Sequence, residues 1–452
     1  MSSSLFAHRD YRLLFTAQVA ALFGTGLTTV ALGLLAYELA GGNAAIVLST
    51  ALTLKMVAYV TVAPIAGAYA GRLPRRQFLM ALNGIRGAIV LALPFVDQIW
   101  QIYALITLLQ IASAAYTPTY QAVLPDILSD ERDYTKALSA AQLAATMETL
   151  LSPMLAAVAL SLISFHWLFV GTGLGFAVSV ALVAAARIPN AAVGDGAITE
   201  RLAAGLRLFA ATPRLRGLLG LNLVVAAAGS VVMVNTVNYA RDVLGGDQSD
   251  VALLLAANGL GTMVIALGLP KILDRRGERP VMLTGAAVLL TGLIAALTLS
   301  TLPTGEWLWP AALTTWAVIG AGTALVLTPT GRVLRRSARP VDRPALFAAQ
   351  FSLSHLAWLI TYPITGWLVT AAGFTATWAT LAVIAALGTT AAARLWPRHD
   401  PAEITHVHEL GSVDPAILAD AIQIGPRHFQ HTHSYVIDPD HPRWPAKTLS
   451  YA

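Results

Sequence analysis

Residues 67–76 read GAYAGRLPRR and place three arginines around one proline, between two long apolar stretches. Charge is scarce elsewhere, because 12% of the 452 residues are charged while 56% are hydrophobic. A soluble protein of this length carries about 25% charged residues. The composition therefore indicates an integral membrane protein, in which residues 67–76 are expected to form a short polar loop between two membrane spans.

Apolar runs long enough to cross a bilayer as a helix, roughly 20 residues each, occur twelve times along the chain. Their limits, uncertain by about two to four residues, are 13–38, 45–70, 78–96, 99–123, 137–163, 166–187, 215–240, 250–272, 281–302, 307–331, 345–370 and 374–396. Very short connections, as at residues 371–373, predict antiparallel helical hairpins. The expected fold is therefore an all-α bundle of twelve transmembrane helices.

The basic residues test the topology of these spans. Of the 29 lysines and arginines, all but Lys55, Arg86 and Arg241 fall in the two terminal segments or in the loops on the same side. Such a bias follows the positive-inside rule. Both termini are therefore expected in the cytoplasm of a multi-pass protein of the bacterial inner membrane. Topology also accounts for the net charge of +5, so no nucleic-acid partner is expected.

The opening loop has a counterpart in the second half of the chain. Residues 271–280 read KILDRRGERP, and Asp274 lies 203 residues after Gly71. A Ser-Pro pair at residues 152–153 and a Tyr-Pro pair at residues 362–363 are also about half a chain apart. Matching features at this offset predict two parallel six-helix repeats. The predicted parts are an N-terminal bundle (1–187), a cytoplasmic linker with an amphipathic helix (188–214), a C-terminal bundle (215–396) and a polar cytoplasmic tail (397–452).

The two loops resemble the signature G-x-L-A-D-R-x-G-R-R/K of the major facilitator superfamily, and the resemblance covers residues 5–396. The first copy keeps Gly67, Arg72, Arg75 and Arg76, with Gly71 and Pro74 where the signature has Asp and Gly. The second copy keeps Asp274, Arg275, Gly277 and Arg279, with Pro270 at the first Gly.

In this family the loop latches the two halves together when the transporter faces outward. The aspartate is central to that latch, and Gly71 cannot replace it. Any latch here is therefore expected to depend more on Asp274. For Arg72, Arg75 and Arg76, a role in topology and turn formation alone remains an equal alternative.

The fifth span carries a second, weaker resemblance. Residues 148–157 read ETLLSPMLAA and are similar to the antiporter motif G-x-x-x-G-P-x-x-G-G. Ser152, Ala156 and Ala157 keep small residues, which let helices approach closely, and Pro153 keeps the proline. The resemblance implies efflux by an antiporter similar to drug:proton exporters.

Ionisable residues inside spans are expensive and need an explanation. Glu148 lies about 17 Å into the fifth span at ~1.5 Å per residue, and it is the leading candidate for a proton carrier, because a low dielectric disfavours its charged form. A structural carboxylate paired with a basic residue is the alternative. Lys55 is the candidate partner, and His355 is either a second proton relay or a packing residue. Arg86 is expected to extend toward the cytoplasmic face.

Neutral polar and aromatic residues within the spans are candidates to line a substrate cavity. They are Gln110, Tyr116, Gln142, Asn222, Asn235, Asn258 and Trp358. A wall with few charges suits an amphipathic or lipophilic organic solute. Ordinary hydrogen bonding between helices is the alternative for any one of them.

The tail holds seven of the ten histidines of the chain. Its low-ranked metal-ligand candidates are His406, His408, His428, His431 and His433, whose spacing suits Ni²⁺, Zn²⁺ or Cu²⁺. The tail loosely resembles that of nickel-resistance members of the superfamily. A partly ordered extension with a short helix at residues 414–424 is the favoured interpretation.

The leading hypothesis is a proton-coupled exporter of small amphipathic organic solutes that works by alternating access. Its expected partners are the solute, protons and the bilayer; it needs no cofactor, and the family usually works as a monomer. No nucleophile–base set indicates an enzyme. The alternatives are a divalent-metal (nickel or cobalt) exporter that uses the tail, and a non-transporting membrane scaffold.

Overall fold

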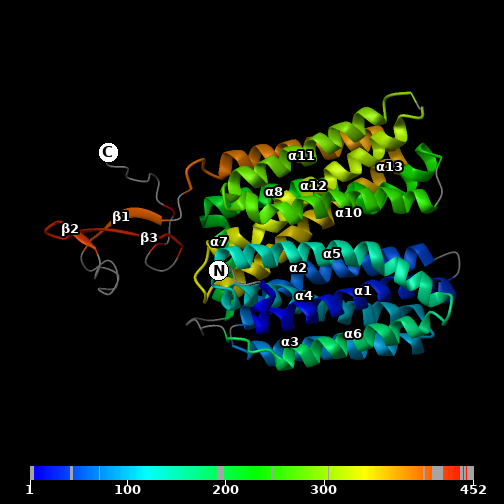
Figure 1. Cartoon of the computed structure of the whole chain (residues 1–452), viewed down its shortest axis with the longest axis horizontal. Helices are drawn as coiled ribbons and strands as arrows, with labels where there is room; N and C mark the ends of the chain where they lie inside the picture. Colours follow the sequence, from blue (N-terminus) through cyan, green and yellow to red (C-terminus); the bar gives the residue numbers. More distant parts are fainter. Residues whose placement is uncertain are drawn as a thin grey trace.

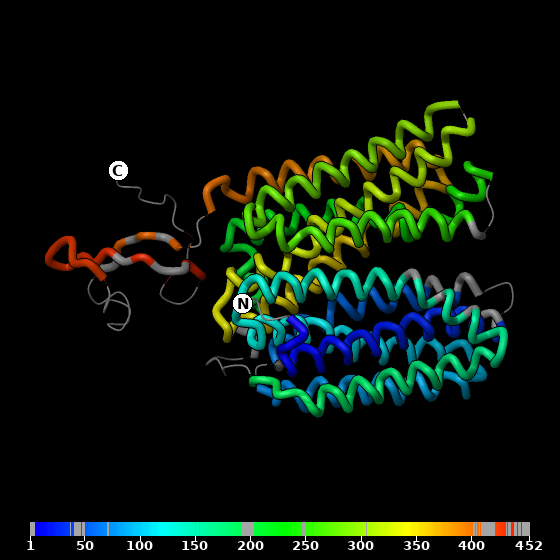
Figure 2. Tube along the Cα trace, viewed as in Figure 1, coloured from blue at the N-terminus to red at the C-terminus, as the bar shows by residue number. Residues whose placement is uncertain are grey.

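The computed structural model describes residues 5–40, 44–70, 72–190, 198–245, 248–303, 305–400, 403–409, 421–437, 441 and 444. Two bundles of long helices lie side by side, and the chain completes the first bundle before it enters the second (Figures 1 and 2). The N-terminus, the linker helix and the tail lie at one end of the molecule. This end also carries Arg75, Arg332 and Arg343, and is called the arginine-rich end below.

The first bundle begins after a short 3₁₀ turn, η1 (Leu5–Ala7). Its helices are α1 (Arg9–Ala40), α2 (Ala44–Ala70), α3 (Arg75–Ala92, extended by the 3₁₀ turn η3, Leu93–Phe95), α4 (Ile99–Ile127), α5 (Glu131–Leu160) and α6 (His166–Ala185). Two clusters of buried apolar side chains form its core, one near the arginine-rich end and one toward the opposite end. Many large apolar residues on the outside are exposed, as expected for a surface that faces lipid.

The second bundle follows α7 (Ile198–Ala211), which matches the helix predicted in the linker. Its elements are α8 (Pro213–Ser230, continued by the π-helical η4, Val231–Asn235, by α9, Thr236–Asn238, and by the π-helical η5, Tyr239–Val243), α10 (Gln248–Leu273), α11 (Glu278–Leu299), α12 (Leu308–Arg335) and α13 (Arg343–Leu395). One large apolar cluster forms most of the core of this bundle, and a smaller one joins α10, α11 and α12.

The number of membrane crossings agrees with the twelve predicted spans. Among the described residues, 10 helices are long and apolar enough to span a membrane, or up to 11 if the bent pair within α5 is one span. The 53 residues of α13 are long enough for two spans, and they are interrupted at Gly373, where φ is 79° and ψ is 179°. Only glycine adopts this conformation readily. Gly373 therefore makes the predicted hairpin between the last two spans.

The two bundles meet most closely where α2 packs against α13. A Cβ atom added to Gly67 would lie 2.4 Å from the Cβ of Ala348 and 3.0 Å from the carbonyl oxygen of Pro344. Farther along the same pair of helices, Phe351 packs with Ala63 and Ala114 in a small apolar cluster, and the Ser352 hydroxyl donates to the Val60 carbonyl at 2.6 Å. Gly67, the first residue of the opening loop, is thus a point of close helix approach.

The tail contains a small antiparallel sheet in the order β1-β3-β2, formed by β1 (Glu403–Glu409), β2 (Ile422–Gly425) and β3 (His428–Ser434). The helix predicted at residues 414–424 is wrong at residues 422–424, which pair with β3 as a strand. The earlier part of that prediction lies outside the described residues. Ile422 and Ile424, the apolar residues of β2, are exposed, so cross-strand pairing rather than burial holds this segment.

Candidate functional site

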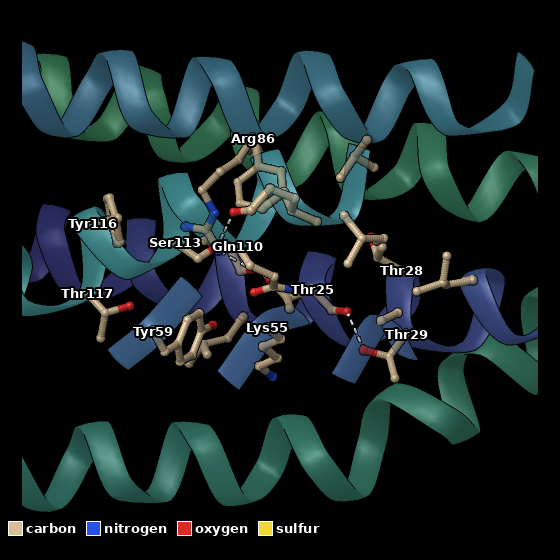
Figure 3. Close-up of a pocket in the computed structure, with 18 of the residues that line it drawn as sticks. Thr25, Thr28, Thr29, Lys55, Tyr59, Arg86, Gln110, Ser113, Tyr116 and Thr117 are labelled. Atoms are coloured by element: carbon tan, nitrogen blue, oxygen red, sulfur yellow. Dashed lines mark hydrogen bonds between the residues drawn. The ribbon is translucent and has the colours of Figure 1, made fainter. Parts of the chain in front are cut away.

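A cavity of about 570 Å³ lies inside the first bundle and is lined by residues of α1 to α6 together with Met233 of η4. Four of the predicted site residues line it: Lys55, Gln110, Tyr116 and Glu148. Figure 3 shows Arg86 beside Gln110, Ser113 and Thr25, with Lys55 and Tyr59 projecting from α2. Its volume suits a small organic molecule.

Glu148 reaches this cavity from α5 and lies against α1. A Cβ atom added to Gly26 would be 2.7 Å from Glu148 Oε1, so the carboxylate occupies space that the missing side chain leaves free. The Thr149 hydroxyl donates to Glu148 Oε2 at 3.4 Å. Within the described part of the chain, no basic nitrogen lies within 4.0 Å of this carboxylate, so the alternative of a direct Lys55–Glu148 ion pair is absent from this conformation.

Arg86 does not extend toward the end of the bundle, and that expectation is wrong. Its side chain is 8% exposed and lines the cavity. The guanidinium carbon lies 4.4 Å from the ring centroid of Phe176 and 5.2 Å from that of Tyr116. Aromatic faces attract the cation, and they hold it within the bundle about 17 Å along α3 from Arg75 at ~1.5 Å per residue.

His355 lies beside this cavity but does not line it. Its Nδ1 is 2.7 Å from the Phe351 carbonyl oxygen, and its ring meets the Tyr59 ring edge-on with centroids 4.7 Å apart. Tyr59 lines the cavity, and the Lys55 ammonium lies 5.5 Å from its ring centroid. One aromatic ring therefore separates His355 from the cavity.

The remaining polar candidates divide between a second cavity and the core of the second bundle. A cavity of about 230 Å³ lies between α5 and the second bundle, and its lining includes Gln142, Asn258 and Trp358. Asn222 instead exchanges two hydrogen bonds with Gln350, at 3.1 and 3.0 Å. Asn235 is completely buried in η4 and lines neither cavity.

An ion-pair network at the arginine-rich end ties the first bundle to the second. Arg75, the first residue of α3, is 1% exposed, and its guanidinium is 2.6 Å from Asp126 Oδ2 at the end of α4. Arg343, at the start of α13, binds the other oxygen of the same carboxylate. Asp126 therefore joins two helices of the first bundle to one of the second, and Arg75 does more than set topology.

A second network repeats this plan with the charges reversed. Glu278 stands at the start of α11, 203 residues after Arg75, and its carboxylate is 2.9 Å from Arg332 near the end of α12. Arg332 also binds Glu131 at the start of α5, in the other bundle. The loop motifs do not include Asp126, Arg343, Glu278 or Arg332. The repeat offset of 203 residues between Arg75 and Glu278 is the one sequence signal that relates the two networks.

The other loop residues take smaller roles. Asp274 is 3.4 Å from Arg132 of α5, so it does link the two bundles, but the Arg132 side chain is 72% exposed and that of Asp274 35%. Arg76 donates to the Ala184 carbonyl at the end of α6, and Arg279, 203 residues later, donates to the Trp396 and Ala393 carbonyls at the end of α13. These two arginines cap the last helix of each bundle. Of the remaining loop residues, Arg72 and Arg275 are exposed, Gly277 precedes α11, and Gly71 lies outside the described residues.

The tail histidines are described only in part. The backbones of His406 and His431 are direct partners across β1 and β3, and those of His408 and His433 pair with Phe429 and Ile404. The side chains of these four histidines lie outside the described part of the structure. Elsewhere in the described ranges, no group of three or more His, Cys, Asp or Glu side chains could hold a metal ion.

Comparisons with known proteins agree with this architecture. The family model described as Major Facilitator Superfamily matches residues 14–309 and 218–424. Among solved structures, the human organic anion transporter MFSD10 (TETRAN) is similar, with a TM-score of 0.71 and 16% identity over 85% of this chain and 99% of that one. A bacterial homologue of the iron transporter ferroportin, in its outward-facing state, has a TM-score of 0.72 and 13% identity over the same shares of the two chains.

No curated protein matches the sequence. The two structural matches show the fold alone, because their identities to this chain are low. The family match is of another kind, because its two segments together cover most of the chain and include both loop motifs. The chain therefore belongs to the Major Facilitator Superfamily, and it is a multi-pass membrane transporter of small molecules rather than an enzyme.

Proposed function

We propose that this protein is a proton-coupled exporter of small amphipathic organic solutes that works by alternating access. Exchange of solute against protons is the mode that the fifth-span motif implies. The observation that carries the proposal is Glu148, a carboxylate that has no ion-pair partner among the described residues and lines a cavity of about 570 Å³. A carboxylate held in this way can exchange a proton where a solute also binds.

The two ion-pair networks support the alternating-access part of the proposal. Both join the bundles at the arginine-rich end, which the positive-inside rule places in the cytoplasm. Asp126 and Arg332 each bind one partner in their own bundle and one in the other. Such pairs stabilise a state closed toward the cytoplasm, and their opening gives the solute entry from that side.

The experiment uses purified protein in liposomes and Glu148→Gln, which keeps the size of the side chain and removes its charge. Solute movement driven by an imposed pH gradient is measured beside exchange of labelled for unlabelled solute without a gradient. We expect the variant to lose gradient-driven movement and to keep exchange. Glu38→Gln, at an exposed position near the other end of α1, is the matched control and should keep both.

Two results would contradict the proposal. Gradient-driven movement with unchanged pH dependence in Glu148→Gln would remove this carboxylate from the coupling step. Failure of the unmodified protein to move any solute in response to a pH gradient would reject proton coupling itself.

A further inference from the structure

Arg86 is a buried cation that no carboxylate neutralises in the described part of the structure. Its two closest hydrogen-bond partners are neutral: Nη1 donates to Asn83 Oδ1 at 3.0 Å, and Nη2 lies 3.5 Å from Thr25 Oγ1. Its Nε is buried and has no hydrogen-bond partner. A guanidinium offers five donors, so Arg86 keeps unused donors in a cavity that it helps to line.

Such a group is costly in the middle of a membrane protein. The ring faces of Phe176 and Tyr116 offset part of that cost and fix the guanidinium between α4 and α6. They do not satisfy its donors. The charge of a structural arginine is commonly neutralised by a carboxylate, as that of Arg75 is by Asp126 in this same chain. The contrast between Arg75 and Arg86 indicates that the partner of Arg86 comes from outside the protein.

The rest of the cavity indicates what kind of partner fits. Lys55 adds a second positive charge on the opposite wall, and Glu148 is the one acidic residue among the lining residues. Gln18, Gln110 and Ser113 add neutral polar groups. Four threonines, two tyrosines and a larger group of apolar side chains complete the lining, so the cavity combines two cationic side chains with apolar surface.

We infer that the cavity binds a small amphipathic organic anion, with an oxyanion group such as a carboxylate on Arg86 and the apolar body against the leucine, isoleucine and valine side chains of the lining. The inference rests on the proposed function and specifies its substrate class. Arginine suits this role because its planar fork can bind both oxygens of a carboxylate. Ionised Glu148 repels such an anion, so protonation of Glu148 favours its binding.

Binding is tested with three ligands that share one ring system and differ in charge: 2-naphthoate, 2-naphthamide and 2-naphthylmethylammonium. Isothermal titration calorimetry on the full-length protein in nanodiscs of zwitterionic lipid gives each affinity. We expect the unmodified protein to prefer 2-naphthoate by roughly tenfold or more, since hydrogen bonds to charged groups are the stronger class. This comparison needs no variant, so it holds even if Arg86 variants fold poorly.

Variants then assign the preference to Arg86. Arg86→Gln should weaken 2-naphthoate binding at least roughly tenfold and leave 2-naphthamide nearly unchanged, while Arg86→Lys should keep part of the preference. Arg241→Gln, an exposed arginine in η5, is the control for loss of charge. Equal affinity for the three ligands, or an Arg86→Gln variant that weakens all three alike, would overturn the inference.

Glu148→Gln separates this inference from the proposed function. If both are right, the variant binds 2-naphthoate a few times more tightly, because a negative charge has been removed, yet loses gradient-driven movement. Anion binding without any proton-driven movement would sustain the inference and reject the coupling. Proton-driven movement of only the neutral or cationic ligand would sustain the proton coupling and reject the inference. Joint loading of an anion and a proton couples their movement in the same direction, so anion movement along the proton gradient would sustain the inference and reject the exchange mode of the proposed function, whereas movement against it would sustain both.

Discussion

The two bundles of this transporter share a fold but place their charges differently. The first bundle carries Lys55, Arg86 and Glu148 around one internal cavity. The spans of the second bundle contain no Asp, Glu, Lys or Arg away from their ends. Several of its interior polar groups are neutral and bind one another, as in the Asn222–Gln350 pair and the Ser230–Thr365 contact at 2.7 Å.

This difference assigns different tasks to the halves. A bundle without buried charges needs no ligand to neutralise it, so it suits a rigid wall. A bundle with unneutralised charges around a cavity gains most from a ligand or a proton. At the arginine-rich end, by contrast, each half contributes one ion-pair network of the same arrangement. The central residue is the acidic Asp126 in one network and the basic Arg332 in the other.

The largest expected effect comes from breaking these two networks. Asp126→Asn should destabilise the closed state by about 3 kcal/mol, the lower end for a buried pair, because Asp126 is 16% exposed. The chain has no cysteine, so Ser113→Cys, in the cavity, can report access without background. A membrane-impermeant thiol reagent should label it from the cytoplasmic side at least roughly tenfold faster in the Asp126→Asn background.

Because the two networks have the same arrangement, we expect the second one to respond to substitution as the first does. Arg332→Gln should accelerate labelling as Asp126→Asn does, since each removes a link within a bundle and one between bundles. Asp342→Asn is the control, because Asp342 pairs at 2.9 Å with Arg339 three residues away in the same bundle. A labelling rate that increases in Asp126→Asn and stays unchanged in Arg332→Gln would show that only the Asp126 network stabilises the closed state.

The sequence predicted the spans well because each span is a local property of composition. Twelve apolar runs, the Gly373 hairpin and the linker helix α7 all agree with the structure. Side-chain direction is different, because it depends on residues that are distant in the chain. Arg86 was expected to reach the membrane surface, yet Phe176 and Tyr116, from α6 and α4, hold it inside.

The ion-pair networks at the arginine-rich end were also difficult to predict, because their partners are distant in the chain. Asp274 was expected to carry the latch because it fills a motif position, and it does contact Arg132. The more buried links use Asp126 and Glu278, which lie just beyond the ends of the predicted spans and look like ordinary loop charges. In the tail, residues 422–424 were expected to be helical, but their pairing with β3 decides their conformation.

A moderate effect is expected from the neutral pair in the second bundle. Asn222→Ala leaves the Gln350 amide buried without its partner, and should lower stability by about 1–2 kcal/mol. Thermal unfolding in detergent of the two single variants and the double variant Asn222→Ala/Gln350→Ala should give a coupling near ~0.6 kcal/mol, the average for such pairs in membranes. Solute binding should stay unchanged; a loss of binding that exceeds the loss of stability would contradict the rigid-wall role.

The smallest effect is expected from the tail. Asp400, which is 7% exposed, accepts hydrogen bonds from Arg214 at 3.2 Å and from the Trp396 indole at 2.9 Å. A chain that ends at Asp400 keeps these contacts and loses three others: the hydrogen bond from Arg214 to the Tyr435 carbonyl, the Trp444 ring 4.9 Å from the Arg214 guanidinium, and the packing of Ile437 against the core of the second bundle. Each is worth about 1–2 kcal/mol of stability, and none lies at the cavity of the first bundle. Transport of organic solutes should therefore change less than about twofold, and the nickel tolerance of cells that express the protein should not change.

A specific fall in nickel or cobalt tolerance would instead favour the metal-exporter alternative, with His406, His408, His428, His431 and His433 as the residues to substitute next. The described tail residues contact the arginine-rich end of the second bundle, so their loss should leave the cavity of the first bundle intact.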